Sequence, residues 1–332
     1  MAETKPLQGL GQLSPFFEQI SKFDEPKESS KSDEMIGKSS NRELSEPWNI
    51  KLQIGADFFT EIFAFIKEMG FNTVIGLTSK RVRLYKLSAD TTHLTYITID
   101  KTELSEYINK DFMSNSLTSK DEVEAEQETI IYVEFDMLDE LSFNSKYPVD
   151  IYFDTKEKNT MYIANEKAIE SRRLNDTSTK NDPSLNSYKM YYDKILEFIK
   201  NEDMVDITVS HTAFSTSVGS VLGRLEKKKT KKDKASSGIL KVKFGLSEID
   251  FFMSNEIKSS SIQMYGDDIA IRAEKEANVT LQVDFLVKFK KLKLMNNVKI
   301  HVNENLPFIL ETKFGAGNIK LFYLISPRIE TE

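Results

Sequence analysis

The stretch "NLPFILETKFGAGNIKLFYLISPRIE" at residues 305–330 has the pattern of a β-hairpin. Residues 306–313 and 319–325 are rich in apolar and β-prone side chains, which favours two strands. Residues 314–318 between them carry two Gly and one Asn, which are typical of a turn, and Pro327 ends the second strand. Terminal segments fray unless a sheet holds them. The sequence therefore predicts that this last strand docks beside another strand.

The same kinds of pattern occur twice along the chain. Residues 49–55 alternate as a strand and precede a helical pattern at 56–69, and residues 204–210 and 211–225 repeat that order. Further strands are predicted at 73–77, 82–87, 94–99, 129–135, 149–153 and 160–164 in the first half, and at 239–245, 248–253, 260–265, 269–273, 278–283, 298–303, 306–313 and 319–325 in the second. Short helices are predicted at 136–143 and 284–294. We infer an internal repeat of architecture.

Composition places the domain boundaries. Residues 1–46 are polar and charged with little to bury, which favours a disordered tail. We predict a first domain at 47–174, with an acidic insertion at about 110–128. A polar connector follows at 175–201, with Pro183 near its middle and a short helix at 190–200. The second domain is predicted at 202–332, with a Lys-rich insertion at about 226–236.

Residue usage argues against an enzyme. The 332 residues contain no Cys and three His, at 93, 211 and 301, which leaves scarcely any nucleophile–base pair or His-rich metal site. No P-loop or dinucleotide-binding Gly motif occurs. We therefore expect no catalysis, no cofactor and no metal. The opening residues are polar and no apolar run reaches about 18 residues, so we expect neither secretion nor a membrane span.

Charge is divided unevenly between the halves. The formal net charge is −7, but residues 201–332 hold 20 Lys and Arg against 17 Asp and Glu, whereas residues 1–200 hold 25 against 35. A protein that is acidic overall can still bind DNA where its basic residues share one face. The second half is therefore the better candidate for contact with nucleic acid.

Two stretches resemble the sliding DNA clamps of the proliferating cell nuclear antigen (PCNA) type. They are "LPFILETKF…GNIKLFYLISPRIE" at 306–330 and "LSADTTHLTYITI" at 87–99. The family has one residue fewer between the positions that match Leu324 and Pro327. So divergent a match suggests a viral or plasmid-borne version. The resemblance implies an α+β fold of two repeated β-rich clamp domains, with helices lining a central hole and sheets outside.

The resemblance also implies a function. Such clamps close three subunits into a ring by pairing edge strands, here roughly 166–173 and 259–266. The homotrimeric ring would encircle double-stranded DNA without reading its sequence and tether a DNA polymerase and other replication and repair proteins, with a clamp loader as a further partner. The expected location is the nucleus or an intracellular viral replication site. Two alternatives stay open, a heterotrimeric checkpoint-type clamp subunit and a monomeric DNA polymerase processivity factor.

Basic residues on the expected inner helices are the DNA-binding candidates. In "DFLVKFKKLKL", Phe285, Leu286, Phe289 and Leu292 can face the sheet while Lys288, Lys290, Lys291 and Lys293 project away. Further candidates are Arg224, Lys67, and Lys227 and Lys228 in the cationic run "EKKKTKKDK", which also fits a nuclear import signal or a solvated insertion. Because "EFDMLDELSF" in the first half is acidic, we expect DNA to lean toward the second domains.

A partner-peptide pocket is carried over from the resemblance by position. Its expected wall residues are Leu87, His93, Leu94, Pro307, Tyr323, Leu324 and Pro327, and connector residues such as Leu185 and Tyr188 would cover it. Partners would insert a short peptide that ends in two aromatic residues, because a few buried apolar anchors supply most of the affinity. Taken one at a time, each of these residues also fits an ordinary core position.

The tail contains a degraded version of such a peptide. In "LGQLSPFF", Leu10, Leu13, Phe16 and Phe17 have the spacing of a clamp-binding peptide, with Leu10 where the family pattern has Gln. A tethered self-peptide would compete with partners through its high effective concentration. There are two other interpretations. The segment is a docking motif for another protein, or it is an apolar segment without such a role.

Overall fold

The computed structural model describes most of the chain beyond the predicted tail. The residues described are 44, 47–68, 72–88, 92–111, 128–134, 147–157, 159–165, 169–174, 192–226, 239–245, 248–254, 259–265, 269–272, 276–282, 286, 288–293, 295, 297–314 and 317–327. Outside these ranges lies the predicted helix at 136–143. Most of each charged insertion also lies outside them, and so does the tail apart from Leu44.

The first half follows the predicted order of elements. It contains β1 (Ile50–Ile54), α1 (Ala56–Glu68), β2 (Asn72–Leu77), β3 (Arg81–Leu87), β4 (His93–Asp100), β5 (Glu106–Asn109), β6 (Thr129–Glu134), β7 (Val149–Asp154), β8 (Thr160–Ala164) and β9 (Ile169–Arg173). The sequence analysis missed β5, because "EYIN" is short and carries no clear alternation. This strand forms through its pairing with β1, in which Tyr107 lies opposite Leu52.

The second half repeats the order. It contains β10 (Val205–Ser210), α4 (His211–Glu226), β11 (Ile239–Phe244), β12 (Glu248–Ser254), β13 (Ser259–Tyr265), β14 (Ile269–Arg272), β15 (Ala277–Gln282), β16 (Asn297–Val302), β17 (Phe308–Phe314) and β18 (Ile319–Ile325). Between the halves lies a helix at residues 192–199, here called the connector helix, as the sequence predicted.

The helix predicted at 284–294 is wrong in length. Lys290 N donates to Leu286 O as in an α-helix, but Lys291 N and Leu292 N donate to the carbonyls three residues earlier. The described part of this stretch, here called the basic segment (286–293), is thus one helical turn that tightens and ends. Its many lysines repel one another, and only Leu286, Phe289 and Leu292 anchor it in the core.

Sheet pairing confirms the two repeated β-rich units. Within the described residues, one sheet has the order β5-β1-β7-β8-β9 and another has the order β13-β12-β11-β15. The third sheet, of nine strands, has the order β14-β10-β16-β17-β18-β4-β3-β2-β6 and therefore joins the halves through the pairing of β18 with β4. The final hairpin docks on a strand of the first half, and this pairing holds the C-terminal strand in place. The exact domain boundaries stay a prediction.

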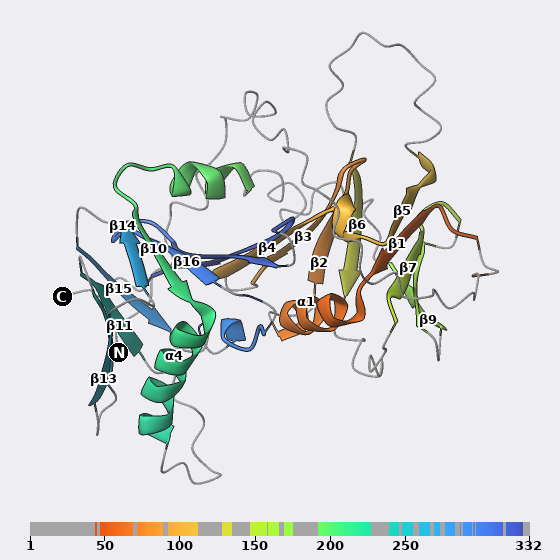
Figure 1. The fold of residues 1–332 in the computed structure, drawn as a ribbon. Coiled ribbons are helices and arrows are strands. Elements are labelled where there is room, and N and C mark those ends of the chain that lie inside the picture. Colours follow the sequence, from red (N-terminus) through yellow and green to blue (C-terminus); the bar gives the residue numbers. More distant parts are fainter. Residues whose placement is uncertain are drawn as a thin grey trace.

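Helices and the connector lie on opposite sides of the nine-stranded sheet. Figure 1 shows α1, α4 and the basic segment below this sheet and the connector helix above it. We call the first side the helix face and the second the connector face. Side chains alternate between the two faces along each strand, so each strand contributes to both. None of the helices in the described ranges has the length and hydropathy needed to span a bilayer.

Aromatic side chains fill the helix face where the halves meet. Phe59 of α1 stacks on Phe63 with centroids 4.2 Å apart, which fits their spacing of one helical turn. Phe289 stacks on Tyr323 with centroids 5.9 Å apart, and Phe65 contacts both rings edge-on. Full burial of each such side chain contributes about 1.5–3 kcal/mol, so this contact fixes the two halves together.

Candidate DNA and partner surfaces

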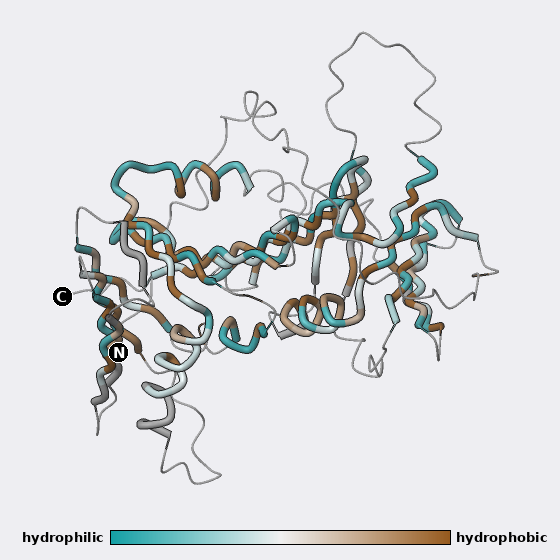
Figure 2. Tube along the Cα trace, viewed as in Figure 1, coloured by the Kyte–Doolittle hydropathy of each residue, from teal (hydrophilic) through white to brown (hydrophobic). Residues whose placement is uncertain are grey.

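The basic segment presents cations on the helix face between α1 and α4. Lys291 and Lys293 are exposed, whereas Lys288 and Lys290 are half-buried. Figure 2 shows this segment as a hydrophilic stretch near the paler α4. Of the four lysines predicted here, two are therefore exposed enough to meet a phosphate backbone, and the other two are partly covered by the protein.

Lys290 lies against the small face of α4. A Cβ added at Gly219 would come 3.4 Å from Lys290 Nζ, so the absence of a side chain at that position makes room for the ammonium group. Nearby, His211 Nε2 lies 2.8 Å from Ser215 Oγ. Burial lowers the pKa of His211 despite a hydrogen bond to the Lys290 backbone and the proximity of Glu61. The imidazole is therefore neutral at neutral pH and fixes the segment by hydrogen bonding.

The first half contributes acidic rather than basic groups to this region. Glu61 Oε2 of α1 accepts a hydrogen bond of 2.9 Å from Lys293 N, and Asp57 is exposed one turn earlier. Lys67 and Arg224 lie in α1 and α4, but their side chains are outside what the structure describes, as are Lys227 and Lys228 altogether. The described cations of the helix face between α1 and α4 thus come from the second half.

The predicted pocket residues divide between the two faces of the sheet. Leu94 and Leu324 are buried in an apolar cluster on the connector face, and Leu87 packs against it. Tyr323 is fully buried on the helix face, where His93 contacts its ring at 5.9 Å. Pro307 is buried and Pro327 half-buried, and Leu185 lies outside the described residues, as does Tyr188. Of the predicted wall residues, the structure thus shows Leu87, Leu94 and Leu324 together on the connector face.

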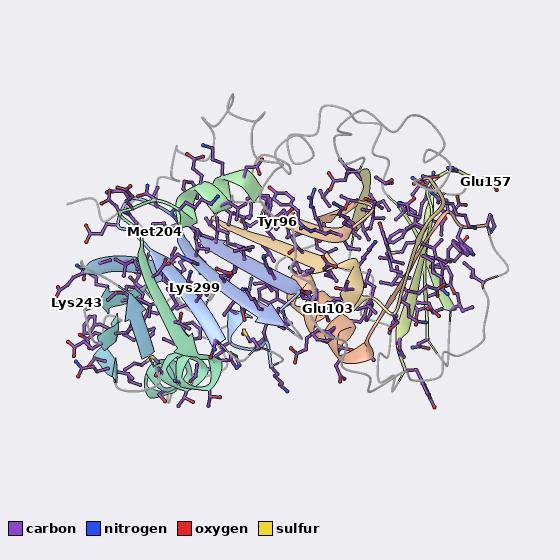
Figure 3. All side chains as sticks on the ribbon, turned by 45° about the horizontal axis from the view of Figure 1, so that its top comes forward. Tyr96, Glu103, Glu157, Met204, Lys243 and Lys299 are labelled. Atoms are coloured by element: carbon purple, nitrogen blue, oxygen red, sulfur yellow. The ribbon has the colours of Figure 1, made fainter. Side chains whose placement is uncertain are left out.

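The connector helix covers this apolar cluster. Tyr192 stacks on Tyr96 with ring centroids 4.7 Å apart, and Ile195 is 1 % exposed. In Figure 3, Tyr96 lies beside this helix. Phe198 and Ile199 pack against the same cluster, which also contains Tyr85, Ile309 and Phe322. Sequence reasoning found the helix but missed Tyr96 and Tyr192 as face-to-face partners, because no local pattern reveals stacking between distant segments.

A buried ion pair lies near the start of the connector helix. Arg83 Nη1 lies 3.2 Å from Glu128 Oε1, and the Glu128 side chain is 3 % exposed. Burial raises the pKa of the nearby Asp193 carboxyl, an effect that the positive charge of Arg83 partly offsets.

An ionic network occupies the second-half part of the connector face. His301 is fully buried, with Nδ1 2.6 Å from Asp206 Oδ1 and Nε2 3.0 Å from Glu311 Oε2. Lys299 Nζ lies 3.2 Å from Asp206 Oδ2. Burial alone would lower the pKa of His301, but its hydrogen bonds to the two carboxylates raise it overall. Interaction with His301 in turn lowers the pKa of Asp206 and of Glu311 despite their own burial.

The residues just before β1 cover a smaller cluster on the first sheet. Tyr152, Tyr162 and Ala164 are buried there, and Leu44 and Trp48 pack against them. Lys110 Nζ lies 3.5 Å from the centroid of the Trp48 ring and donates to the Trp48 carbonyl at 2.9 Å. These contacts fix the point at which the predicted tail meets the first domain.

Two exposed apolar side chains lie at or next to sheet edges. In the described residues, β9 is an end strand of the first sheet and β13 is an end strand of the four-stranded sheet. Ile169 on β9 and Phe252 on β12, the neighbour of β13, are each 40 % exposed. These sheets lie at opposite ends of the molecule, as Glu157 and Lys243 mark in Figure 3. Exposed edges of this kind invite pairing with another strand.

The architecture of two joined β-rich units with helices on one face matches solved structures. PCNA from A. fulgidus, in a structure described as the C-terminal region of FEN-1 bound to it, is 15% identical, with a TM-score of 0.62 over 85% of this chain and 100% of that one. PCNA from Entamoeba histolytica is 12% identical, with a TM-score of 0.60 and the same coverage. This chain has the PCNA-type clamp fold. No family model and no curated protein matches its sequence.

Within the described ranges, no group of three His, Cys, Asp or Glu side chains is arranged to hold a metal ion. The buried His301 lies between Asp206 and Glu311, whose side chains are 30% and 15% exposed. These groups bind one another, which is a structural role.

Proposed function

We propose that this protein is a sliding clamp that encircles duplex DNA and tethers a DNA polymerase and other replication and repair proteins. The observation that carries the proposal is the repeat itself. β18 of the second unit pairs with β4 of the first, whereas β9 and β13 are end strands of sheets that lie at opposite ends of the molecule (Figure 3). Pairing β9 of one copy with β13 of the next would continue the same rule, and three copies of a PCNA-type fold would close a ring.

The basic segment would face the DNA in this ring. Its exposed Lys291 and Lys293 suit contact with phosphates, which needs no sequence recognition and permits sliding. Because α1 contributes Asp57 and Glu61 instead, the duplex would lie closer to the second domains. The predicted contacts of Arg224, Lys67, Lys227 and Lys228 belong to the same proposal.

The connector face would receive partner proteins. The similar A. fulgidus clamp binds the C-terminal region of FEN-1, which supports peptide capture by this fold. Here the apolar cluster around Leu94 and Leu324 and the connector helix above it would form the docking surface. The tail segment with Leu10, Leu13, Phe16 and Phe17 would compete for it as a tethered self-peptide.

Light scattering on the purified chain tests the ring directly. We expect a mass of about three times the 38.1 kDa of one chain, held over a wide concentration range. Ile169→Lys should reduce the mass toward that of a single chain, because the charge lies at the proposed joint. Tyr147→Lys is the matched control, since Tyr147 is 42 % exposed and precedes β7, which is two strands from the edge strand β9. A wild-type chain of 38.1 kDa at every concentration would contradict self-assembly.

Two other functions remain as alternatives. A heterotrimeric checkpoint-type subunit would share the fold but pair its edges with different chains. A monomeric processivity factor would hold DNA on the basic segment without a ring. Both predict a monomer in isolation, which separates them from the homotrimer. A viral origin, dependence on a clamp loader, and a location in the nucleus or at a viral replication site are further parts of the proposal.

A further inference from the structure

The two halves can be matched residue by residue from the points where their first helices begin. α1 begins at Ala56, one residue beyond the end of β1, and α4 begins at His211, directly after β10. Matching these starts places Phe59 with Phe214, and both are buried. Phe65 of α1 then corresponds to Ser220 of α4.

The strand registers extend the match to the outer strands. In the first half, one row of opposite residues runs through Leu52, Ile151, Ile163 and Glu170. In the second half, the equivalent row, also four residues before the helix begins, runs through Ile207, Ile300, Leu310 and Tyr323. Glu170 therefore corresponds to Tyr323. By one further step, Ile169 corresponds to Phe322.

The other sheet can be matched through its hairpins. Leu77 lies opposite Val82 and Phe244 opposite Ile249, so the two hairpins have the same loop length. Counting outward, a row through Val74, Tyr85 and Tyr96 corresponds to a row through Lys241, Phe252 and Ser261. Ser261 is thus the counterpart of Tyr96, and Phe252 is the counterpart of Tyr85.

The joint within the chain then predicts the joint between chains. Phe322 lies opposite Tyr96 where β18 pairs with β4. We propose that β9 of one copy pairs antiparallel with β13 of a second copy so that Ile169 lies opposite Ser261 and Glu170 opposite Ser260. This register rests on the proposed function, because it requires the chain to self-assemble. It adds to the proposed function the identity of the residues that meet between copies and the strength of that contact relative to the one within the chain.

On the connector face, this register brings the two exposed apolar side chains together. Phe252 lies directly beside Ser261, and a serine is too small to cover a neighbouring ring. Ile169 would enter from the far side of Ser261 and pack over that gap toward Phe252. The two residues, each 40 % exposed in one chain, would thereby be covered in the assembly. The alignment of Ile169 with Phe252 follows from the strand registers alone and does not depend on the exposure of either side chain.

On the helix face, the two joints differ in chemistry. Within the chain, Tyr323 contacts Phe65 with ring centroids 5.6 Å apart. The counterparts are Glu170 and Ser220, both half-buried in the single chain. An aromatic contact is thus replaced between copies by a carboxylate and a hydroxyl, which retain water more readily. The joint between copies is therefore the weaker of the two and the place where the ring opens.

Cross-linking tests the register. The chain has no Cys, so any disulfide must come from introduced residues. Directly opposite residues in an antiparallel pair have Cβ atoms about 4.5–5.5 Å apart, which is close enough for a disulfide after small adjustments. The double variant Ile169→Cys with Ser261→Cys should form covalent dimers and trimers under mild oxidation, reversed by reductant. Ile169→Cys with Ile262→Cys is the control, because those side chains would point to opposite faces.

The outcomes separate the register from the ring. Efficient cross-linking of the first pair and little of the control supports the register. An oligomer by light scattering in which the control pair cross-links better, or neither pair does, overturns the register and leaves the ring intact. A wild-type chain that is monomeric at every concentration, with neither pair cross-linked, overturns both.

A second substitution tests the polarity of the joint. Glu170→Tyr restores at the joint the residue type of its counterpart, and Ser220 leaves space for the ring. We expect the midpoint concentration for dissociation of the oligomer to fall by about 10-fold or more, because an apolar ring would be buried in place of a hydrated carboxylate. Glu157→Tyr, at an exposed turn away from β9, is the matched control and should not change the dissociation. An unchanged or weakened oligomer with Glu170→Tyr would overturn the polar-joint account.

Discussion

The connector face has two regions in which different interactions stabilise the buried side chains. Around Tyr96 and Phe322 the strands present apolar side chains, and the connector helix must cover them. Around His301 the same sheet presents charged groups that satisfy one another. An apolar surface needs a cover, which another segment can in principle replace, whereas a satisfied ionic network has no need of one. The difference indicates why the first region, rather than the second, suits the docking of a partner.

Breaking the ionic region should have the largest effect on stability. His301→Ala would leave Asp206 and Glu311 close together without the cation between them. Removal of one partner from a buried pair costs about 3–5 kcal/mol, and we expect a loss of that order in urea unfolding. Lys299→Ala is the control, since its side chain is 40% exposed and should cost under about 1 kcal/mol. Equal losses for the two variants would show that His301 is not the centre of the network.

The same network predicts how stability depends on pH. The folded pKa of His301 is raised, so its contribution is fully present below its unfolded value of about 6.5 and is lost as pH rises through the folded value. The lowered pKa values of Asp206 and Glu311 act at the acid end, where their contribution is lost as pH falls through the folded values. We expect the wild-type Tm to fall more between pH 6 and pH 9 than that of His301→Gln, measured by thermal melts in matched buffers.

The apolar region should respond to a comparable deletion with a smaller global loss. Ile195→Ala removes the most buried side chain of the connector helix, a change that costs about 2–5 kcal/mol in a closed core. An eight-residue helix can detach on its own, so we expect about 1 kcal/mol in urea unfolding together with faster hydrogen exchange in residues 196–200. Lys200→Ala, at an exposed position directly after the helix, should change neither. A loss of about 2–5 kcal/mol in the free energy of unfolding, as in a closed core, would mean that the helix unfolds only with the whole protein.

The basic segment should change binding and leave stability nearly untouched. The double variant Lys291→Ala with Lys293→Ala removes two exposed cations, so we expect the slope of log K against log salt for duplex DNA to fall by about 2. Unfolding should shift by less than about 0.5 kcal/mol. Lys80→Ala with Lys101→Ala, two exposed lysines of the first half, is the matched control for fluorescence anisotropy. An equal loss with the control pair would place DNA elsewhere.

Much of the local structure was predictable because it follows from short-range patterns. The apolar spacing of Phe59, Ile62 and Phe63 predicted α1, and the apolar, β-prone composition of 319–325 predicted β18. The strand β5 was missed because its four residues have no such pattern. The helix at 284–294 was predicted too long because leucine and lysine favour helices by propensity. In the structure the hydrogen bonds tighten after Lys290, and Lys293 N donates to Glu61 of α1 instead of continuing the helix.

The sequence by itself determined which residues share a face of each strand, the repeat of two β-rich units, and the excess of cations in the second half. Only the tertiary structure decided that β18 pairs with β4, that Tyr323 and Leu324 point to opposite sides of that pairing, and that His301 lies between Asp206 and Glu311. The physical reason is range. Side-chain alternation is set by the backbone of a single strand, whereas pairing partners and the cover of each face depend on segments that are distant in sequence.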